Sequence, residues 1–272
     1  MEYEPIKKSL GRFFTGPLFL GKSLYFLLDL LLLRSWHVRK ALKKITLLFP
    51  GEANVLDAGS GLGQYTWGTS RMNKGWKIKG LDINSQHVED CTRFFKKAGL
   101  SERVSFETAD LISFSERDRY DIILSVDVME HIKEDEVVFK NLYNSLKKNG
   151  LILISTPSDQ GGSDVHDDNE SSFIDEHVRD GYGIGEITEK LTSAGFRNIK
   201  ATYTYGKPGN ISWHISIKYP VRMLNISRLF FIILPFYYMI FSPVSVILNI
   251  FDLNLIHKTG TGLLVMAEKQ ER

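Results

Sequence analysis

The feature that most constrains the fold is a glycine-rich turn between a short apolar run and a helical segment. The run ends in Asp57, and the turn that follows contains Gly59, Gly61 and Gly63. Glycine adopts positive φ angles without steric cost and lets the backbone approach a ligand closely. Residues 64–72 then have the pattern of a helix, whose N-terminus offers backbone N–H groups. This order predicts a ligand-binding edge of an α/β sheet.

The same alternation continues along the chain and predicts the fold class. The predicted strands are 54–56, 77–83, 104–108, 120–126, 151–155 and 199–204, and the predicted helices are 64–72, 85–98, 134–148 and 186–194. We expect Asn149 with Gly150, and Gly195, to end two of these helices, because they accept a left-handed C-cap. Strands alternating with helices at this spacing predict an α/β fold with a doubly wound, mostly parallel sheet.

The glycine spacing separates two classes of cofactor site. The dinucleotide fingerprint needs a third glycine at the position that Gln64 occupies here. The pattern is instead Asp-x-Gly-x-Gly-x-Gly, with Asp57 at the end of the strand. This pattern resembles the first motif of the class I S-adenosylmethionine-dependent methyltransferases.

Further motifs of that family follow in register, so the resemblance covers about residues 45–205. The matching residues are Asp82 and Ile83 after the second predicted strand, Asp110 and Leu111 after the third, and Asp127 after the fourth. The stretch 146–155 resembles the family's passage from a helix into the fifth strand. The resemblance implies a seven-stranded, Rossmann-like sheet and S-adenosyl-L-methionine as the cofactor.

The resemblance also implies a role for each acidic residue. Asp57 would orient the ammonium group of the cofactor, Asp82 would hold the ribose hydroxyls, and Asp110 would bind the adenine amino group. The predicted cofactor site is completed by Gly59, Gly61, Gly63, Ile83, Leu111 and Asp127. From the residues alone, each acid has a structural alternative: a cap of the loop, a helix N-cap or a turn.

The acceptor side is expected just after the fourth strand, where Asp127, Glu130 and His131 follow one another. His131 is the candidate catalytic base, since an imidazole titrates near pH ~6.5. Glu130 is a candidate for binding the substrate. The segment also resembles the metal-carrying one of ubiquinone-biosynthesis O-methyltransferases, which have Glu where this chain has Asp127. We expect a hydrogen-bonded helix start here and predict no metal.

A polar loop at 157–183 is too long for a plain connector and supplies further substrate candidates. These candidates are His166, His177, Arg179 and Tyr182. The segment resembles the substrate lid of the family, and the planar fork of Arg179 could pair an anionic group. The alternative is a surface salt bridge from Arg179 to Asp175 or Asp180.

Composition and charge exclude several classes. A hydrophobic fraction of 43% with 17 Phe excludes disorder, and the single cysteine, Cys91, excludes a disulfide framework and a cysteine-rich zinc site. Cys91 lies in an amphipathic helix and is expected to be a packed side chain. The N-terminus lacks the pattern of a signal peptide, so we expect a cytoplasmic protein.

Charge is unevenly distributed, with +6 over residues 1–44, −8 over 45–206 and +4 over 207–272. A nucleic-acid partner would want a continuous basic face, so none is expected. An acidic middle between basic, apolar ends suits a catalytic body whose ends approach an anionic membrane. The predicted domains are a helical extension at 1–44, the methyltransferase core at 45–206, an apolar helical insertion at 207–261 and a last core strand at 262–272.

Two segments, 18–33 and 229–251, are strongly apolar, and the second has no charged residue. The second could pack, lie in a membrane interface or span a bilayer. We predict that Pro235 and Pro243 divide it into short helices, because proline removes a helix donor. A final strand from Gly262, antiparallel in the family, would return the chain to the sheet and exclude a single crossing.

These features lead to a predicted function. We expect a cytoplasmic methyltransferase that lies peripherally on the membrane. Its expected reaction is methylation of an oxygen of a hydrophobic or lipid-linked small molecule. One alternative is a methyltransferase for a soluble sugar or another polar metabolite. The other, from a different class, is a non-catalytic scaffold with a cofactor fold. The retained acids Asp57, Asp82 and Asp110 argue against the scaffold.

Overall fold

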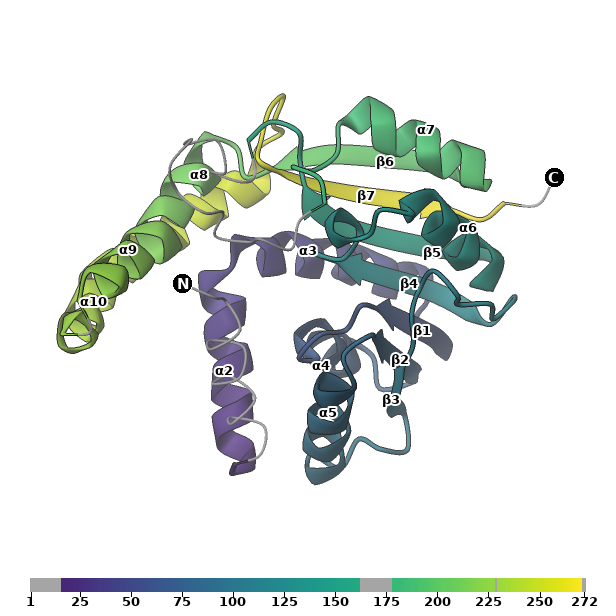
Figure 1. Ribbon diagram of the computed structural model, residues 1–272, viewed down its shortest axis with the longest axis horizontal. Helices are drawn as coiled ribbons and strands as arrows, with labels where there is room; N and C mark the ends of the chain where they lie inside the picture. Colours follow the sequence, from purple (N-terminus) through teal and green to yellow (C-terminus); the bar gives the residue numbers. More distant parts are fainter. Residues whose placement is uncertain (1–15, 162–177, 228, 271–272) are drawn as a thin grey trace.

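The computed structural model describes residues 16–161, 178–227 and 229–270, and its centre is a seven-stranded sheet. The strands are β1 (Ala53–Ala58), β2 (Trp76–Asp82), β3 (Val104–Thr108), β4 (Tyr120–Val126), β5 (Leu146–Pro157), β6 (Arg197–Thr204) and β7 (Gly262–Glu268). Their order is β3-β2-β1-β4-β5-β7-β6, and β7 alone of these runs antiparallel to its neighbours (Figure 1). The predicted α/β fold, its seven strands and its antiparallel last strand are confirmed.

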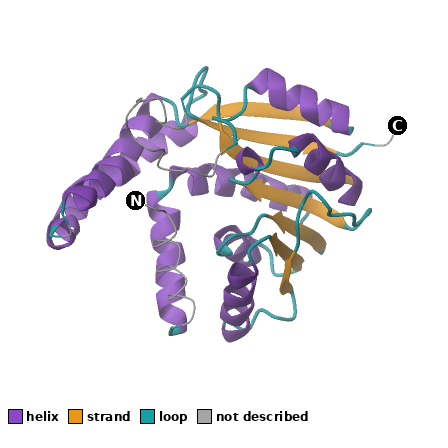
Figure 2. Ribbon diagram, viewed as in Figure 1, coloured by secondary structure: helices purple, strands orange, loops and turns teal. Residues whose placement is uncertain are grey.

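Helices cover the two faces of the sheet (Figure 2). On one face lie α3 (Leu33–Leu48), α4 (Gln64–Met72) and α5 (Ser85–Lys97), and on the other lie α6 (Asp135–Ser145) and α7 (Ile184–Ala194). Each set buries its apolar stripe against the strands and forms its own core cluster. Gly195 has φ 114° and ends α7 as predicted.

The N-terminal segment is part of this core. Helix α2 (Leu18–Leu31) joins α3 through Leu32, whose extended backbone separates the two helices. Tyr25 of α2 is fully buried and stacks on Trp67 of α4, and Ile45 of α3 is also fully buried. The expected domain boundary at residue 44 therefore falls inside a helix that covers the sheet.

One predicted helix end is wrong. Helix α6 ends at Ser145, and β5 begins at Leu146, which pairs with Tyr120 of β4. Asn149 has a positive φ of 60°, but inside β5, where its N–H donates to the carbonyl of Lys269 at 2.8 Å. Asn149 and Gly150 thus shape an irregular strand edge instead of stopping a helix.

Residues 207–254 form a helical hairpin that projects from the sheet (Figure 1). Its first arm is an unbroken run of α8 (Lys207–Trp213), the π-helical η2 (His214–Lys218) and α9 (Tyr219–Ile226), and its second arm is α10 (Phe230–Asn254). The arms contact each other along their length. The prediction of short helices is wrong, because Pro235 and Pro243 both lie inside α10.

The continuity of α10 has a local reason. A proline fixes φ near the helical value, so its cost is a lost donor and crowding of the preceding turn. Between the two prolines, the hydroxyls of Tyr237 and Tyr238 donate to the carbonyls of Ile215 and Ser216, at 2.7 and 2.8 Å. These two bonds to the first arm support the continuity of α10 across both prolines.

Candidate active site

The glycine turn lies at the carboxyl edge of the sheet, between β1 and α4. Gly59, Gly61 and Gly63 all have positive φ angles, of 85°, 51° and 75°. A Cβ at Gly59 would collide with Val128, and one at Gly63 would lie 3.0 Å from Sγ of Cys91. Among the described residues, none has an atom within 4 Å of a Cβ placed at Gly61. The turn is thus packed from below and open on one side.

The turn is fastened to the end of β2. The N–H groups of Gly59 and Ser60 donate to the carbonyl of Leu81, at 2.9 and 2.7 Å. The N–H of Gly61 donates to Oδ2 of Asp82 at 2.7 Å. These three N–H groups of the turn serve the fold, whereas the N–H groups expected to be offered to a ligand are those of the N-terminus of the helix that follows.

Asp82 holds the second corner of this edge. Burial disfavours its charge, but the nearby His87 and the N–H groups of Asn84 and Gly61 outweigh burial and hold its pKa below the usual range. The ionised carboxylate keeps lone pairs beyond those that accept these bonds. Ile83, the next residue, is 73% exposed. An exposed aliphatic side chain beside a carboxylate suits an adenosine, with its apolar base and its vicinal hydroxyls.

Asp57 lies beneath the turn. Its side chain is buried and accepts a hydrogen bond from Oγ1 of Thr66 at 2.5 Å. Burial raises the pKa of Asp57 to about 6, against the opposing effect of the Thr66 hydrogen bonds. An approaching ammonium group would favour the ionised form. Asp57 thus links β1 to α4 through Thr66, and its carboxylate can also pair with a cation.

The adenine end is predicted at Asp110 and Leu111, after β3. Asp110 is exposed, and its Oδ1 accepts the N–H of Ile112 at 2.9 Å, which is a turn contact. Leu111 is buried in the core. Asp110 therefore stabilises a turn, as the structural alternative expects, and its carboxylate is also exposed at the predicted edge.

The acceptor rim begins at Asp127, directly after β4. Asp127 has φ 55°, and its carboxylate forms an ion pair with Arg34 at the start of α3. The backbone N–H of Arg34 donates to the hydroxyl of Tyr205, at 2.8 Å. Sequence reasoning missed Arg34, because no local pattern links residue 34 to residue 127. An N-terminal helix thus reaches the rim of the site.

Glu130 and His131 lie in a short 3-10 turn, η1 (Met129–His131). Glu130 is 1% exposed, and Oγ1 of Thr156 donates to it at 3.1 Å. Its backbone carbonyl accepts the N–H of Val178 at 3.1 Å. His131 is half-buried beside it. The turn therefore brings the candidate base to the rim and keeps the neighbouring carboxylate inside.

The segment after 177 is fastened to Asp135. Nη1 of Arg179 lies 2.6 Å from Oδ2 of this buried carboxylate, to which the hydroxyl of Tyr182 also donates at 2.6 Å. Nζ of Lys190 lies 2.8 Å from the same oxygen. Burial and then Asp135 raise the pKa of Tyr182 well above its usual range. The partner of Arg179 is thus Asp135, and not the Asp175 or Asp180 considered from sequence. His166 and His177 lie outside the described residues.

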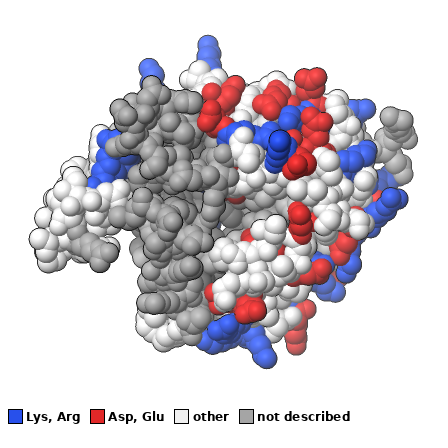
Figure 3. Space-filling view, in the orientation of Figure 1, with Lys and Arg blue, Asp and Glu red and all other residues white. Residues whose placement is uncertain are grey.

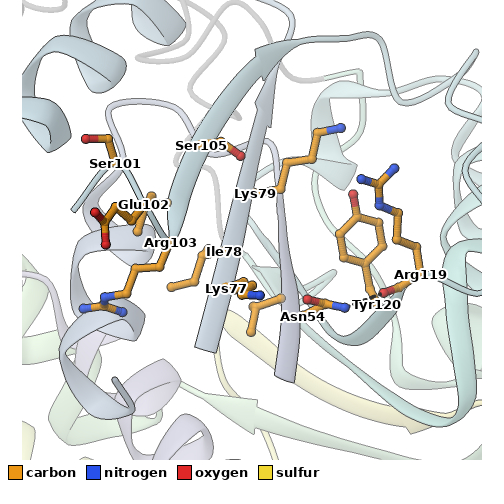
Figure 4. A pocket seen from close by; sticks show the side chains of 12 residues that line it. Asn54, Lys77, Ile78, Lys79, Ser101, Glu102, Arg103, Ser105, Arg119 and Tyr120 are labelled. Atoms are coloured by element: carbon orange, nitrogen blue, oxygen red, sulfur yellow. Dashed lines mark hydrogen bonds between the residues drawn. The ribbon is translucent and has the colours of Figure 1, made fainter. Parts of the chain in front are cut away.

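Two further features bear on where a ligand binds. A hollow of about 300 Å³ is lined by residues from the amino ends of β1 to β4, among them Asn54, Lys77 and Tyr120 (Figure 4). This is the edge opposite the glycine turn, so it is not the predicted cofactor site. Within the ranges that the structure describes, no three His, Cys, Asp or Glu side chains cluster as a metal site requires.

A family model described as a methyltransferase domain matches residues 51–195, slightly more than half of the chain. The chain belongs to the class I S-adenosylmethionine-dependent methyltransferases. The methyl donor of this family is S-adenosyl-L-methionine. The open side of Gly61, the ionised Asp82 and the exposed Ile83 fit that cofactor.

Curated methyltransferases match over part of their length. A ubiquinone biosynthesis O-methyltransferase of Bradyrhizobium diazoefficiens is 29% identical over 106 residues, which are 39% of this chain and 40% of that protein. A sterol 24-C-methyltransferase of Aspergillus fumigatus is 26% identical over 167 residues, 59% of this chain and 44% of that protein. The match thus spans less than half the length of these relatives.

Solved methyltransferase structures share the fold over most of the chain. One from Galdieria sulphuraria, described as a sarcosine dimethylglycine methyltransferase, has a TM-score of 0.61 at 19% identity and covers 87% of this chain and 86% of that one. A phosphoethanolamine N-methyltransferase of Haemonchus contortus, solved with S-adenosyl-L-methionine, has a TM-score of 0.57 at 18% identity, with 81% and 49% covered. At these identities the likeness establishes the fold alone.

Proposed function

We propose that this protein transfers the methyl group of S-adenosyl-L-methionine to an oxygen of a hydrophobic or lipid-linked small molecule, at the cytoplasmic surface of a membrane. The observation that carries the proposal is the carboxyl edge around Gly61, where an open glycine lies beside an ionised Asp82. An S-adenosyl group needs both features, a close backbone approach and an acceptor for two hydroxyls.

The proposed chemistry asks the protein mainly for position. The cofactor supplies an activated methyl group on a sulfonium, so the chain's residues bind, align and exclude water. His131 is the proposed base that accepts the proton of a hydroxyl acceptor. Asp127, which pairs with Arg34, and Glu130, which accepts a hydrogen bond from Thr156, precede His131 on the same rim.

The apolar acceptor is supported by the relatives and by the hairpin. Ubiquinone and sterols, which appear in the relatives' names, are both apolar molecules. In this chain, β6 and the antiparallel β7 meet the hairpin at the carboxyl edge, which is also the edge of the glycine turn. An apolar surface beside the site suits an acceptor that arrives from a lipid phase.

The test combines binding and turnover. Calorimetry of the full chain should show binding of S-adenosyl-L-methionine and S-adenosylhomocysteine and none of NAD. Incubation with methyl-labelled cofactor and either lipid extracts or soluble metabolites, followed by mass spectrometry, should place the label in a lipid-soluble product. Label found only in polar products would contradict the proposed acceptor class, and NAD binding would contradict the proposed cofactor site.

A further inference from the structure

The hairpin 207–254 has an apolar exterior. Residues 229–251 carry no charge, and 6% of the most apolar window of α10 is buried. In the described part of the chain, α10 is the helix long and apolar enough to cross a membrane. Its exposed side chains include Ile232 (70%), Phe236 (63%), Met239 (73%), Ile240 (65%), Ile247 (53%) and Phe251 (59%). Figure 3 shows the projecting hairpin as a largely uncharged surface with a group of basic side chains, beside a core that carries both signs.

The seam between the arms is, by contrast, small and polar. Gly209, Ser212 and Ser216 of the first arm are buried against α10, whose own buried residues include Ser245 and Asn249. Oγ of Ser212 donates to the carbonyl of Ser245 at 3.2 Å. Small residues in the seam and large apolar ones outside are the arrangement of helices packed in lipid. The hairpin thus exposes its apolar side chains and buries small polar ones, whereas the core buries its apolar side chains.

The base of the hairpin is rigidly attached to the core. Asp252 of α10 is fully buried, and its Oδ1 lies 2.9 Å from Nε2 of His37 on α3. Its Oδ2 accepts the N–H of Gly209 at 2.9 Å. Nζ of Lys40 donates to the carbonyl of Leu253 at 2.6 Å. These bonds fix the direction in which the apolar arm leaves the sheet.

The first arm carries three basic residues, and Arg228 follows it in the sequence. Lys207 and Arg222 are exposed on an arm whose side toward α10 is formed by buried small residues, and Lys218 lies between them in sequence. The outer face of α10 has no charge at all between residues 229 and 251. One arm therefore suits the acyl region of a lipid leaflet, and the other suits anionic head groups.

We propose that the hairpin docks on an anionic phospholipid bilayer, with the outer face of α10 in the acyl region of one leaflet and Lys207, Lys218 and Arg222 at the head groups. A single crossing is excluded by topology, since β6 and β7 at the two ends of the segment pair in one sheet. A double crossing would place Lys218 and Arg222 in the acyl region, where charges are costly. The docking itself is independent of the proposed methyl transfer, and only the entry of the acceptor from the leaflet rests on it.

The experiment is flotation of the full chain with vesicles of phosphatidylcholine containing phosphatidylglycerol, compared with phosphatidylcholine alone. Wild-type protein should float with the anionic vesicles and detach in part in high salt. Ile240→Glu and Ile247→Glu, at exposed positions of α10, should each lower vesicle binding at least about tenfold, because a charge must enter the acyl region. Arg222→Glu should lower binding about fivefold or more, on anionic vesicles only.

Matched controls separate docking from folding and from catalysis. Val137→Glu places the same charge at an exposed valine of α6 and should leave vesicle binding unchanged. All variants should keep the melting temperature and the affinity for S-adenosyl-L-methionine, which tests the proposed function separately. Wild-type protein that stays out of the floating fraction overturns docking. So does a homodimer that Ile240→Glu dissociates while vesicles bind neither form, because the face would then belong to a second copy.

Discussion

The two halves of the carboxyl edge differ in whether their polar side chains already have partners within the protein. In the cofactor half, no described residue crowds Gly61, and Asp82 keeps acceptor capacity beside an exposed Ile83. In the acceptor half, Asp127 is paired with Arg34, Glu130 with Thr156, and Arg179 with Asp135. The cofactor half is built from a backbone path, and the acceptor half from side-chain partners far apart in the sequence. A motif describes the first much better than the second.

The largest expected effect tests whether the acceptor half contains a catalytic group. His131→Ala should lower kcat about 10²–10⁴-fold if a hydroxyl is methylated, because the base that accepts its proton is lost. The affinity for S-adenosyl-L-methionine should stay unchanged in calorimetry. The limb of the pH–rate profile that reports a general base should disappear. An unchanged rate at every pH would make His131 a structural residue.

The next effect tests whether the remainder of that half is structural. Asp135→Ala removes the buried carboxylate that Arg179 and Lys190 share and leaves them the more distant and more exposed Glu186; both cationic side chains are only 18% exposed. Removal of one partner from a buried ion pair costs about 3–5 kcal/mol, so chemical denaturation should show a loss of that size. Glu189→Ala, an exposed carboxylate of α7, is the control. Equal stability of the two variants would free Arg179 for the role of binding an acceptor.

The third effect concerns the buried acid of the cofactor half. Burial raises the pKa of Asp57 from 3.8 to about 6 in the folded chain. A raised pKa means that the group favours folding below pH 3.8 and that this contribution is lost as the pH rises through 6. Asp57→Asn should therefore stabilise the fold at pH 8, by up to about 3 kcal/mol, and should give no gain at pH 3.5. Thermal melts at the two pH values measure this.

The same variant should lose affinity for the cofactor, because an amide cannot neutralise its ammonium group. A gain in stability at pH 8 together with a loss of cofactor affinity would show that Asp57 lowers the stability of the fold and raises the affinity for the cofactor. A stability change that is equal at both pH values would contradict the raised pKa.

The smallest effect is expected at the second corner of the cofactor half. Asp82→Ala should weaken binding of S-adenosyl-L-methionine by roughly 1–3 kcal/mol, because the ribose hydroxyls lose their acceptor. Isothermal calorimetry measures the change, and Glu189→Ala again serves as the control. Unchanged affinity in Asp82→Ala would remove the strongest assignment of the cofactor half.

The sequence predicted the features that depend on local order. All seven strands, the helix 64–72 and the positive φ angles of the three glycines are present, because period and turn chemistry act over a few residues. The end of α6 was misplaced, since it depends on the pairing of Leu146 with the distant Tyr120. The continuity of α10 at Pro235 and Pro243 depends on hydrogen bonds donated to η2. The ion-pair partners Arg34 and Asp135 depend on tertiary packing. The roles of the site residues stay predictions.

The place of β7 in the sheet has a consequence for biosynthesis. β7 lies between β5 and β6, although its residues follow β6 in the chain by the whole length of the hairpin. At about 5–20 residues per second, a ribosome needs roughly 3–11 s to translate the 57 residues between Thr204 and Gly262. During that interval β6 has no neighbour to pair with, and α10 is translated before β7. The apolar side chains of α10 are thus synthesised before the sheet that anchors the hairpin can be completed.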